Sequence, residues 1–191
     1  VRKAVIPLAG KGTRLRPMTS VTPKALFPLV DASGRVRAVL QILLEEVGDA
    51  GIEEVCLVVS PEQSTVVREY LRAAQRCFQT RWPSNICFVE QTEAKGFGHA
   101  VLQAESFVGG EPFALLLGDH IHVTETGGVS CVRQVLDAFG GQVAKAMIGV
   151  HAVDERVVHT VGAAAGAQIS RRTFRCTDFI EKPDRHVAEE R

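Results

Sequence analysis

The sequence has no long apolar run and no net charge, and these two absences narrow the kind of protein that it encodes. None of its stretches reaches the roughly 18 uninterrupted apolar residues that a membrane-spanning helix needs. Its 22 basic and 22 acidic residues balance to a formal charge of zero at pH 7. No global field therefore draws the protein to nucleic acid or to an anionic membrane. Any anion must be bound by a local group of residues.

The sequence also gives no sign of a disulfide framework. Its five cysteines are odd in number and scattered, and no Cys-x-x-Cys motif occurs. Such cysteines are more often reduced core residues than disulfides or zinc ligands, which fits a reducing compartment. The chain starts with Val1 to Lys3 and continues into a strand pattern rather than the core of a signal peptide. We therefore expect a soluble, cytoplasmic protein without nucleic-acid or membrane partners.

Strand-like and helix-like segments alternate along the chain. Continuous apolar runs predict buried strands at residues 3–9, 55–59, 86–89, 113–117 and 144–150. Apolar residues at helical spacing predict helices at residues 36–47, 66–71, 99–107 and 129–139. Buried strands separated by amphipathic helices imply a largely parallel sheet covered on both faces. We therefore predict a single α/β domain over residues 1–191, a Rossmann-like three-layer sandwich with a largely parallel mixed sheet.

The most distinctive stretch runs from Leu8 to Thr19, directly after the first predicted strand. It carries two glycines, three cations and no acidic residue, which suits a polyanion lying against bare backbone. Gly10 and Gly12 would let main-chain N–H groups approach phosphate oxygens, and the planar guanidinium of Arg14 can hold two oxygens at once. Lys24, a little further on, supplies a more compact charge. The sequence therefore predicts a nucleoside triphosphate site.

Two common glycine-rich motifs do not match this loop. It is not a P-loop, because no Gly-Lys-Ser/Thr closes it. It is not a dinucleotide fingerprint, because Leu15 occupies the third glycine position, and this makes an oxidoreductase unlikely. A tight turn with solvated cations is the remaining alternative to a triphosphate site.

Two further polar motifs follow predicted strands. Gln91 has both a donor and an acceptor for the amide edge of a pyrimidine, and Gly96 would let the backbone approach the same ring. Asp119 ends a buried apolar strand, where a carboxylate needs a partner or a cation, and Mg²⁺ prefers such hard oxygen ligands. The alternatives are an ordinary loop for Gln91 and a turn or helix cap for Asp119. Because ligands bind beyond the carboxyl ends of parallel strands, we expect the Gly10 loop, Gln91 and Asp119 to meet at one edge.

Three histidines and a charged pair near the end of the chain complete the candidates. His99 lacks an orienting acid, so we favour a structural or loop-ordering role over a general base. His120 and His122 share a strand face, but no third metal ligand is evident. Glu181 and Lys182 would point to opposite sides of a regular strand, so either a local twist brings both heads to one side or only one of them acts.

Taken in order, these motifs resemble those of the sugar-1-phosphate nucleotidyltransferases, most closely the bacterial glucose-1-phosphate uridylyltransferase-like group. The segment from Leu8 to Thr19 is similar to the family signature Leu-Ala-Ala/Gly-Gly-x-Gly-Thr-Arg-Leu-x-Pro-x-Thr, and the segment from Gln91 to Ala100 to Gln-x-x-x-x-Gly-x-Gly-His-Ala. The resemblance extends from Lys3 to Pro183. It implies nucleotidyl transfer from UTP to a sugar 1-phosphate, giving a UDP-sugar and pyrophosphate, with Mg²⁺ as cofactor.

The resemblance also implies a role for each matching residue. The two catalytic cations steady the departing pyrophosphate and neutralise charge near the α-phosphate, and further residues bind the nucleotide, the sugar phosphate and the metal. The matching residues are Arg14 and Lys24 for catalysis; Ala9, Gly10, Gly12, Thr13, Gln91 and Gly96 for the nucleotide; Gly162, Glu181 and Lys182 for the sugar phosphate; and Asp119 for Mg²⁺.

Two departures from the family pattern concern the metal site. His120 stands where the family usually has Asp or Asn. The family also has a second metal-binding aspartate, in an Asp-x-Gly segment downstream of Glu-Lys-Pro, and none follows Pro183 here. We therefore expect a domain that lacks the family's C-terminal portion. A non-catalytic nucleotide-sugar-binding or regulatory module, and a same-fold enzyme that uses dTTP or another NTP, stay open, as does a homo-oligomer.

Overall fold

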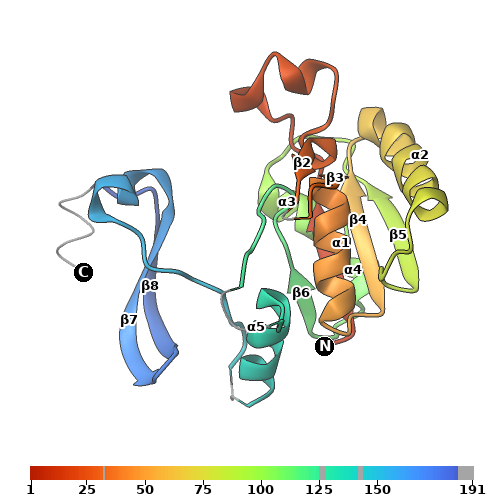
Figure 1. Ribbon diagram of the computed structural model, residues 1–191. Helices are drawn as coiled ribbons and strands as arrows, with labels where there is room; N and C mark the ends of the chain where they lie inside the picture. The colour runs from red at the N-terminus through yellow and green to blue at the C-terminus, as the bar shows by residue number, and fades with distance from the viewer. Residues whose placement is uncertain (32, 125–127, 142–143, 185–191) are drawn as a thin grey trace. The chain divides into compact units, whose positions relative to one another are not determined.

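The computed structural model describes residues 1–31, 33–124, 128–141 and 144–184 (Figure 1). The chain divides into two compact units, Val1–Asp137 and Ala138–Arg191. The first unit is built on a four-stranded sheet with the order β5-β4-β1-β6. Its strands are β1 (Lys3–Pro7), β4 (Glu54–Val59), β5 (Asn85–Glu90) and β6 (Phe113–Leu115). Every neighbouring pair in this sheet is parallel.

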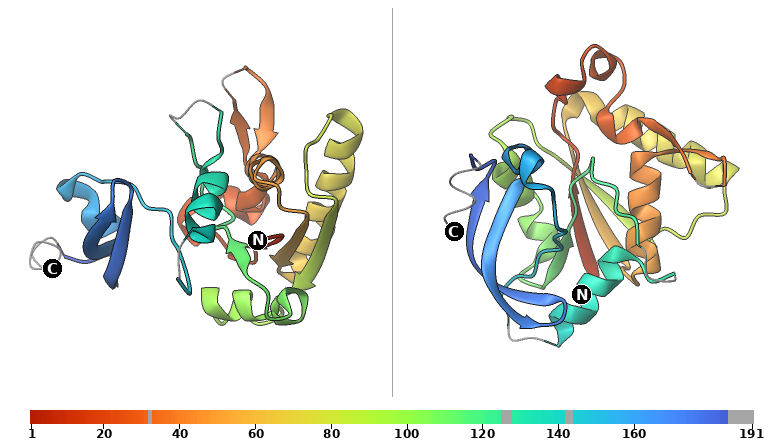
Figure 2. Two further views of the ribbon diagram at one scale, coloured as in Figure 1. Left: turned by 90° about the horizontal axis from the view of Figure 1, so that it is seen from below. Right: turned by 60° about the vertical axis from the view of Figure 1, so that its left-hand side comes forward.

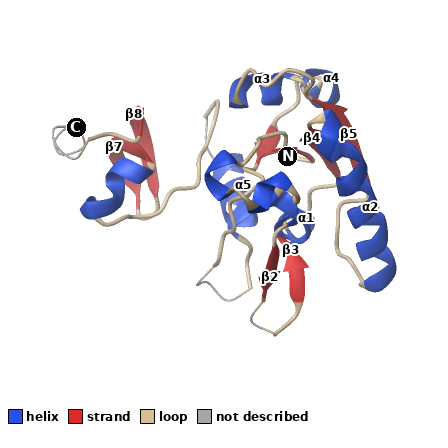
Figure 3. Cartoon of the chain, turned by 90° about the horizontal axis from the view of Figure 1, so that it is seen from above, coloured by secondary structure: helices blue, strands red, loops and turns tan. Residues whose placement is uncertain are grey.

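Helices cover both faces of this sheet. On one face, α1 (Val39–Asp49) and α2 (Pro61–Cys77) pack their apolar residues against alternate side chains of β1 and β4. On the other face lie α3 (Phe97–Leu102) and α4 (Glu105–Val108), which contact Val5, Cys56 and Val58. Figure 3 shows α3 and α4 on one side of the sheet and α1 on the other. These three layers confirm the predicted α/β sandwich with a largely parallel sheet.

A fifth helix and a hairpin complete the first unit. The helix α5 (Cys131–Gly140) adds Val132 and Leu136 to the core on the α1 side of the sheet. The hairpin consists of β2 (Pro28–Val30) and β3 (Val36–Ala38), which pair in antiparallel fashion. The element α5 matches the helix predicted at residues 129–139.

Three sequence predictions were wrong in detail. The helix predicted at residues 36–47 begins only at Val39, because residues 36–38 pair with β2 instead. The helix predicted at 99–107 is interrupted by a turn and divides into α3 and α4. Residues 144–150 form no strand: Ile148 and Val150 are 53% and 64% exposed. An extended segment needs a neighbouring strand to take its backbone hydrogen bonds, and these residues have none among the described ones.

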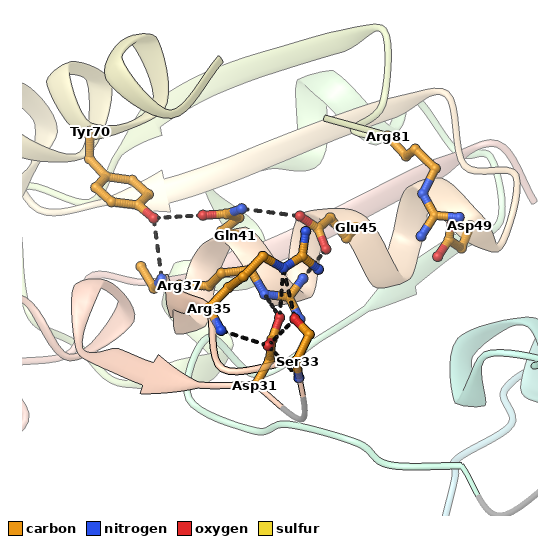
Figure 4. Close-up of polar contacts among 10 residues, drawn as sticks. Asp31, Ser33, Arg35, Arg37, Gln41, Glu45, Asp49, Tyr70 and Arg81 are labelled. Carbon is orange, nitrogen blue, oxygen red and sulfur yellow. Dashed lines mark hydrogen bonds and ion pairs between the residues drawn. The ribbon is translucent and has the colours of Figure 1, made fainter. Parts of the chain in front are cut away.

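A network of charged residues holds the β2–β3 hairpin against α1 (Figure 4). The Asp31 carboxylate accepts hydrogen bonds from the Ser33 hydroxyl and from the Arg35 backbone N–H. Arg37 bridges Asp31, at 3.0 Å, and Glu45 of α1. The hydrogen bond from the Ser33 hydroxyl, followed by those from the backbone, holds the pKa of the Asp31 carboxyl well below its ordinary range. The hairpin is therefore held by charge rather than by apolar packing.

The same network continues into α2. The Tyr70 hydroxyl lies 3.0 Å from Gln41 Oε1 and 3.2 Å from the Ala38 backbone nitrogen, which donates to it (Figure 4). Gln41 is buried and donates in turn to Glu45. A hydrogen-bonded chain of this kind satisfies polar groups that would be costly to bury unpaired.

The second unit contains a short 3₁₀ helix, η4 (Glu155–Thr160), and a hairpin of β7 (Gly162–Ser170) and β8 (Thr173–Glu181). The two strands pair from Gly162 opposite Glu181 to Ser170 opposite Thr173, with register shifts on the way (Figure 2). Among the described residues of both units, none of the helices is both long and apolar enough to cross a membrane.

All five cysteines are free thiols, but the expectation that they lie in the core is right only for Cys56. Cys56 on β4 is fully buried opposite Cys87 on β5. Burial raises the pKa of the Cys56 thiol to about 12, and it raises that of Cys87 as well. Cys77, the last residue of α2, and Cys176 on β8 are exposed.

This contrast predicts the order in which the cysteines react. The thiolate is the nucleophile, so a buried thiol with a raised pKa reacts slowly. We expect iodoacetamide at pH 8 to modify Cys77 and Cys176 in the native protein while Cys56 stays unmodified until the protein is unfolded. Peptide mass spectrometry after timed alkylation measures this order. Early modification of Cys56 would contradict the burial of β4.

Candidate active site

The phosphate-binding candidates lie directly after β1. The backbone N–H groups of Leu8 and Ala9 donate to the Val58 carbonyl at 2.7 and 3.1 Å, so the chain follows β4 up to Ala9 and leaves the sheet only there. Three short 3₁₀ helices follow: η1 (Thr13–Leu15), η2 (Met18–Ser20) and η3 (Lys24–Leu26). The loop therefore starts at the carboxyl edge of the sheet.

Gly12 fixes the shape of this loop. Its φ angle of 59° is in the left-handed region, and a Cβ atom there would lie 2.7 Å from Thr19 Cγ2. The Thr19 hydroxyl donates to the Gly12 carbonyl at 2.8 Å, which draws η2 back over the loop. No described residue accepts a hydrogen bond from the backbone N–H groups of residues 10–14. Backbone N–H groups without a protein partner can bind anionic oxygens where they converge.

Lys24 and Asp119 form the charged centre of the site. Lys24 Nζ lies 2.7 Å from Asp119 Oδ2, and the two side chains are 18% and 42% exposed. The stem of Lys24 passes over Gly10, since a Cβ atom on Gly10 would lie 3.7 Å from Lys24 Cε and Nζ. The loop after β1 and the helix η3 thus meet the turn after β6, which lies about 95 residues further along the chain.

Gly118 allows Asp119 to reach this point. The Leu116 N–H donates to the Val5 carbonyl, so the chain continues beside β1 beyond the end of β6. A Cβ atom on Gly118 would clash with Leu8 and would lie 2.8 Å from the Pro7 carbonyl oxygen. Only a residue without a side chain lets the two segments approach so closely.

Gln91 lies at the end of β5. Its backbone N–H donates to the Val59 carbonyl, and its side chain is buried. The side-chain Nε2 donates to the Gly96 carbonyl at 3.2 Å and contacts His99 Nδ1 at 2.9 Å. Gly96 has a φ angle of 95°, which favours glycine, and it begins α3. Gln103, one turn after His99, contacts the other ring nitrogen of the histidine at 3.2 Å.

The expected convergence at one sheet edge is seen for the Gly10 loop, Lys24 and Asp119, while Gln91 lies further along the same edge. The strand β4 separates β5 from β1. Neighbouring strands are about 4.8 Å apart, so Gln91 follows a strand about 10 Å from the one that leads to Gly10. The edge thus presents a cationic, N–H-rich region and, two strands away, a buried amide.

The other candidates of the first unit are less defined. Thr13 and Arg14 are exposed, and Arg14 makes no ion pair with a described residue. His120 and His122 are also exposed, and the described residues contain no group of three or more His, Cys, Asp or Glu side chains that could hold a metal. Asp119 is the one described residue that the sequence predicts as a metal ligand.

The sugar-phosphate candidates lie in the second unit. Gly162 pairs with Glu181 across the β7–β8 hairpin, and a Cβ atom on Gly162 would lie 2.7 Å from Phe179 Cζ. Lys182 has a φ angle of 50°, and its backbone N–H donates to the Val161 carbonyl at 3.0 Å. This left-handed conformation turns the Lys182 side chain so that Nζ lies 3.5 Å from Glu181 Oε1. Both heads thus lie on one side, as the first of the two expected arrangements requires.

Sequence reasoning gave no role to Thr19, Gln103 or Gly118. The spacing of Gln103, four residues after His99 on a helical pattern, was a signal that the two side chains meet. The contact of Thr19 with Gly12 depends on the path of the loop, and the sequence carries no signal for it.

Comparison with known proteins agrees with this geometry. A sequence model of the family described as nucleotidyl transferase matches residues 3–191, and the chain therefore belongs to the nucleotidyl transferase family. It is 34% identical to UTP–glucose-1-phosphate uridylyltransferase YngB of Bacillus subtilis, over 96% of this chain and 64% of that protein. It is 32% identical to UTP–glucose-1-phosphate uridylyltransferase 2 of Staphylococcus saprophyticus, over 98% of this chain and 67% of that one. The chain thus spans about two thirds of the length of these relatives.

Solved structures show the same likeness. A UDP-glucose pyrophosphorylase complexed with UDP-glucose superimposes with a TM-score of 0.82 at 25% identity, over 98% of this chain and 71% of that one. The UTP-bound enzyme from Acinetobacter baumannii superimposes with a TM-score of 0.80 at 27% identity, over 98% and 70% of the two chains.

The close approach at Gly118 predicts a stability effect. We expect Gly118→Ala to lower the free energy of unfolding by about 1–3 kcal/mol, because the new methyl group meets backbone that cannot move cheaply. Gly98→Ala in α3 is the matched control, since nothing lies within 4 Å of a Cβ atom there. Urea unfolding followed by circular dichroism measures both. Equal stability of the two variants would show that β1 and the turn after β6 are not closely packed.

Proposed function

We propose that the protein catalyses uridylyl transfer from UTP to glucose 1-phosphate, giving UDP-glucose and pyrophosphate. The observation that carries this proposal is the Lys24–Asp119 ion pair over Gly10, beside a run of free backbone N–H groups. Relatives with 32–34% identity bear the name of this activity, and similar structures contain UDP-glucose or UTP. Site and family thus support the same reaction.

In this proposal the protein acts by positioning and by neutralising charge. The N–H groups of residues 10–14 and the guanidinium of Arg14 hold the β- and γ-phosphates, and Lys24 faces the α-phosphate. An oxygen of the sugar phosphate attacks the α-phosphorus, a new P–O bond forms, and the bond to the β-phosphate oxygen breaks in line. The electron pair leaves with pyrophosphate, which Arg14 stabilises. No covalent bond to the protein is needed.

Asp119 is the residue that would hold Mg²⁺. Its carboxylate is a hard oxygen ligand, partly exposed, and only Oδ2 is engaged by Lys24. Mg²⁺ is commonly bound by one or two carboxylates together with substrate phosphates, so one protein ligand fits its chemistry. When bound, the ion would supply positive charge to the reacting phosphates. Lys24 then no longer needs Asp119 as its counter-ion and is free to face the α-phosphate.

The remaining roles follow the family resemblance. The Glu181 carboxylate would accept hydrogen bonds from sugar hydroxyls, and the Gly162 backbone N–H would donate one to the sugar. Lys182 would bind the sugar phosphate. Gln91 and Gly96 would contact the base, with UTP favoured over dTTP by the names of the relatives. Five free cysteines suit a reducing compartment, and we propose a cytoplasmic location.

Pyrophosphate release tests the function directly. We expect turnover with Mg²⁺, glucose 1-phosphate and UTP, and much slower turnover with dTTP, CTP, GTP or ATP. Other sugar 1-phosphates, tested with UTP, measure the choice of sugar. Tight UTP binding without turnover would favour a non-catalytic nucleotide-binding module, and faster turnover with dTTP would favour a thymidylyltransferase.

The ion pair predicts that removal of the Asp119 carboxylate changes UTP affinity differently in the absence and in the presence of metal. In EDTA, Asp119→Asn removes a negative charge and frees Lys24, so we expect UTP to bind about three- to tenfold more tightly than to the wild type. With Mg²⁺ present, the same variant should gain little from the metal, whereas the wild type gains much. Isothermal titration calorimetry under both conditions measures this.

Asp137→Asn is the matched control for this experiment. Asp137 is an exposed carboxylate of α5 paired with Arg133, and its removal should change UTP binding under neither condition. Weaker binding of UTP to Asp119→Asn in EDTA would show that Asp119 does not compete with phosphate for Lys24.

A further inference from the structure

The orientation of the Gln91 side-chain amide is fixed by its neighbours. A glutamine amide has one donor end and one acceptor end of nearly the same shape, so its direction depends on what it contacts. The end that faces Gly96 meets a backbone carbonyl, which only accepts, and must therefore be the NH₂ group. One amide hydrogen goes to this carbonyl, and the other points at His99 Nδ1, 2.9 Å away.

His99 can take this hydrogen only as an acceptor. A neutral imidazole has one nitrogen that accepts and one that donates, so the contact with Gln91 assigns the accepting role to Nδ1. The imidazole is half-buried. On its far side Gln103 Nε2 donates to the His99 carbonyl and lies 3.2 Å from the other ring nitrogen. That contact is longer than the one with Gln91 and, with Nδ1 as the acceptor, it joins two N–H donors and is no hydrogen bond.

The consequence for Gln91 is that its oxygen is the free end. Both donors of the amide are engaged, and no described residue donates to Oε1. Oε1 is also not fully enclosed by the protein, so a ligand can reach it. A buried side chain that presents only an acceptor selects a ligand with a donor at that position.

We propose that His99 is a specificity-determining positioning residue, which sets the choice of base by holding Gln91 with its oxygen toward the nucleotide. This inference rests on the proposed function, in which Gln91 contacts the base. Uracil and thymine carry an N–H at ring position 3, which donates to Oε1, whereas cytosine carries an unprotonated nitrogen there and would face it with a second acceptor. His99 thus favours pyrimidines with an imide N–H without touching the base itself.

Replacement of the imidazole tests this inference. His99→Phe fills the same space but offers no acceptor, so the Gln91 amide loses one of its two anchors and its direction is held by the Gly96 carbonyl alone. We measure the dissociation constants of UTP and of CTP by calorimetry in the presence of Mg²⁺. We expect the wild type to prefer UTP and His99→Phe to lower the ratio of the two constants about fivefold, the value of one hydrogen bond.

Two further variants keep the test decisive. His99→Leu removes the same acceptor with a smaller side chain, and it should lower the ratio in the same direction even if His99→Phe does not fold. His151→Phe, at an exposed position in the second unit, is the matched histidine control and should leave the ratio unchanged.

The outcomes separate the inference from the proposed function. If the wild type prefers UTP and neither His99→Phe nor His99→Leu changes the ratio, His99 is a structural residue and the inference is overturned while the function stands. The same holds if both variants weaken UTP and CTP by equal factors. If the wild type binds UTP and CTP equally, Gln91 does not select the base, and the uracil part of the proposed function fails together with the inference.

Discussion

The parallel alignment of β1 with β4 and β6 is the constraint on which the site depends. Because parallel strands end at the same edge, the loops that follow them are delivered to one place whatever their distance in the sequence. Leu8 and Ala9 stay hydrogen-bonded to β4 beyond the end of β1, and Leu116 stays bonded to β1 beyond the end of β6. Both loops therefore leave the sheet late, and Gly10 and Asp119 meet the same lysine.

In the proposed function this edge of the sheet binds a triphosphate, and the charges of the site suit that ligand. A triphosphate brings several negative charges to a region that already contains the Asp119 carboxylate. Without a ligand, Lys24 neutralises that carboxylate, which limits the cost of holding either charge partly away from water. The pair is half-exposed, so its contribution to stability is small, and Lys24 can change partner at little cost. A pair of this kind is suited to a ligand that brings its own cation.

Sequence reasoning predicted the central sheet well because its strands are continuous apolar runs, and burial on both faces requires such runs. It predicted the loop after β1 because glycines and cations without acids are rare in one short segment. It failed where tertiary partners decide the conformation. Residues 36–38 carry a helical pattern but pair with β2, and an ion network of Asp31, Arg37 and Glu45 holds them there. The turn of Lys182 depends on one backbone angle that no residue type there signals.

In the proposed function, the two ends of the nucleotide site rest on different physics. Affinity for the phosphates comes from charge and from free N–H groups, which act on any triphosphate. Choice of base needs a group with direction, and an amide has direction only when its surroundings distinguish nitrogen from oxygen. Gly96 and His99 do this together. The Gly96 carbonyl accepts one hydrogen of the Gln91 amide nitrogen, and His99 Nδ1 accepts the other, which would otherwise be available to the ligand. Because the imidazole acts through an amide rather than on the base, its effect is confined to selectivity, and the phosphate contacts that supply most of the binding are left unchanged.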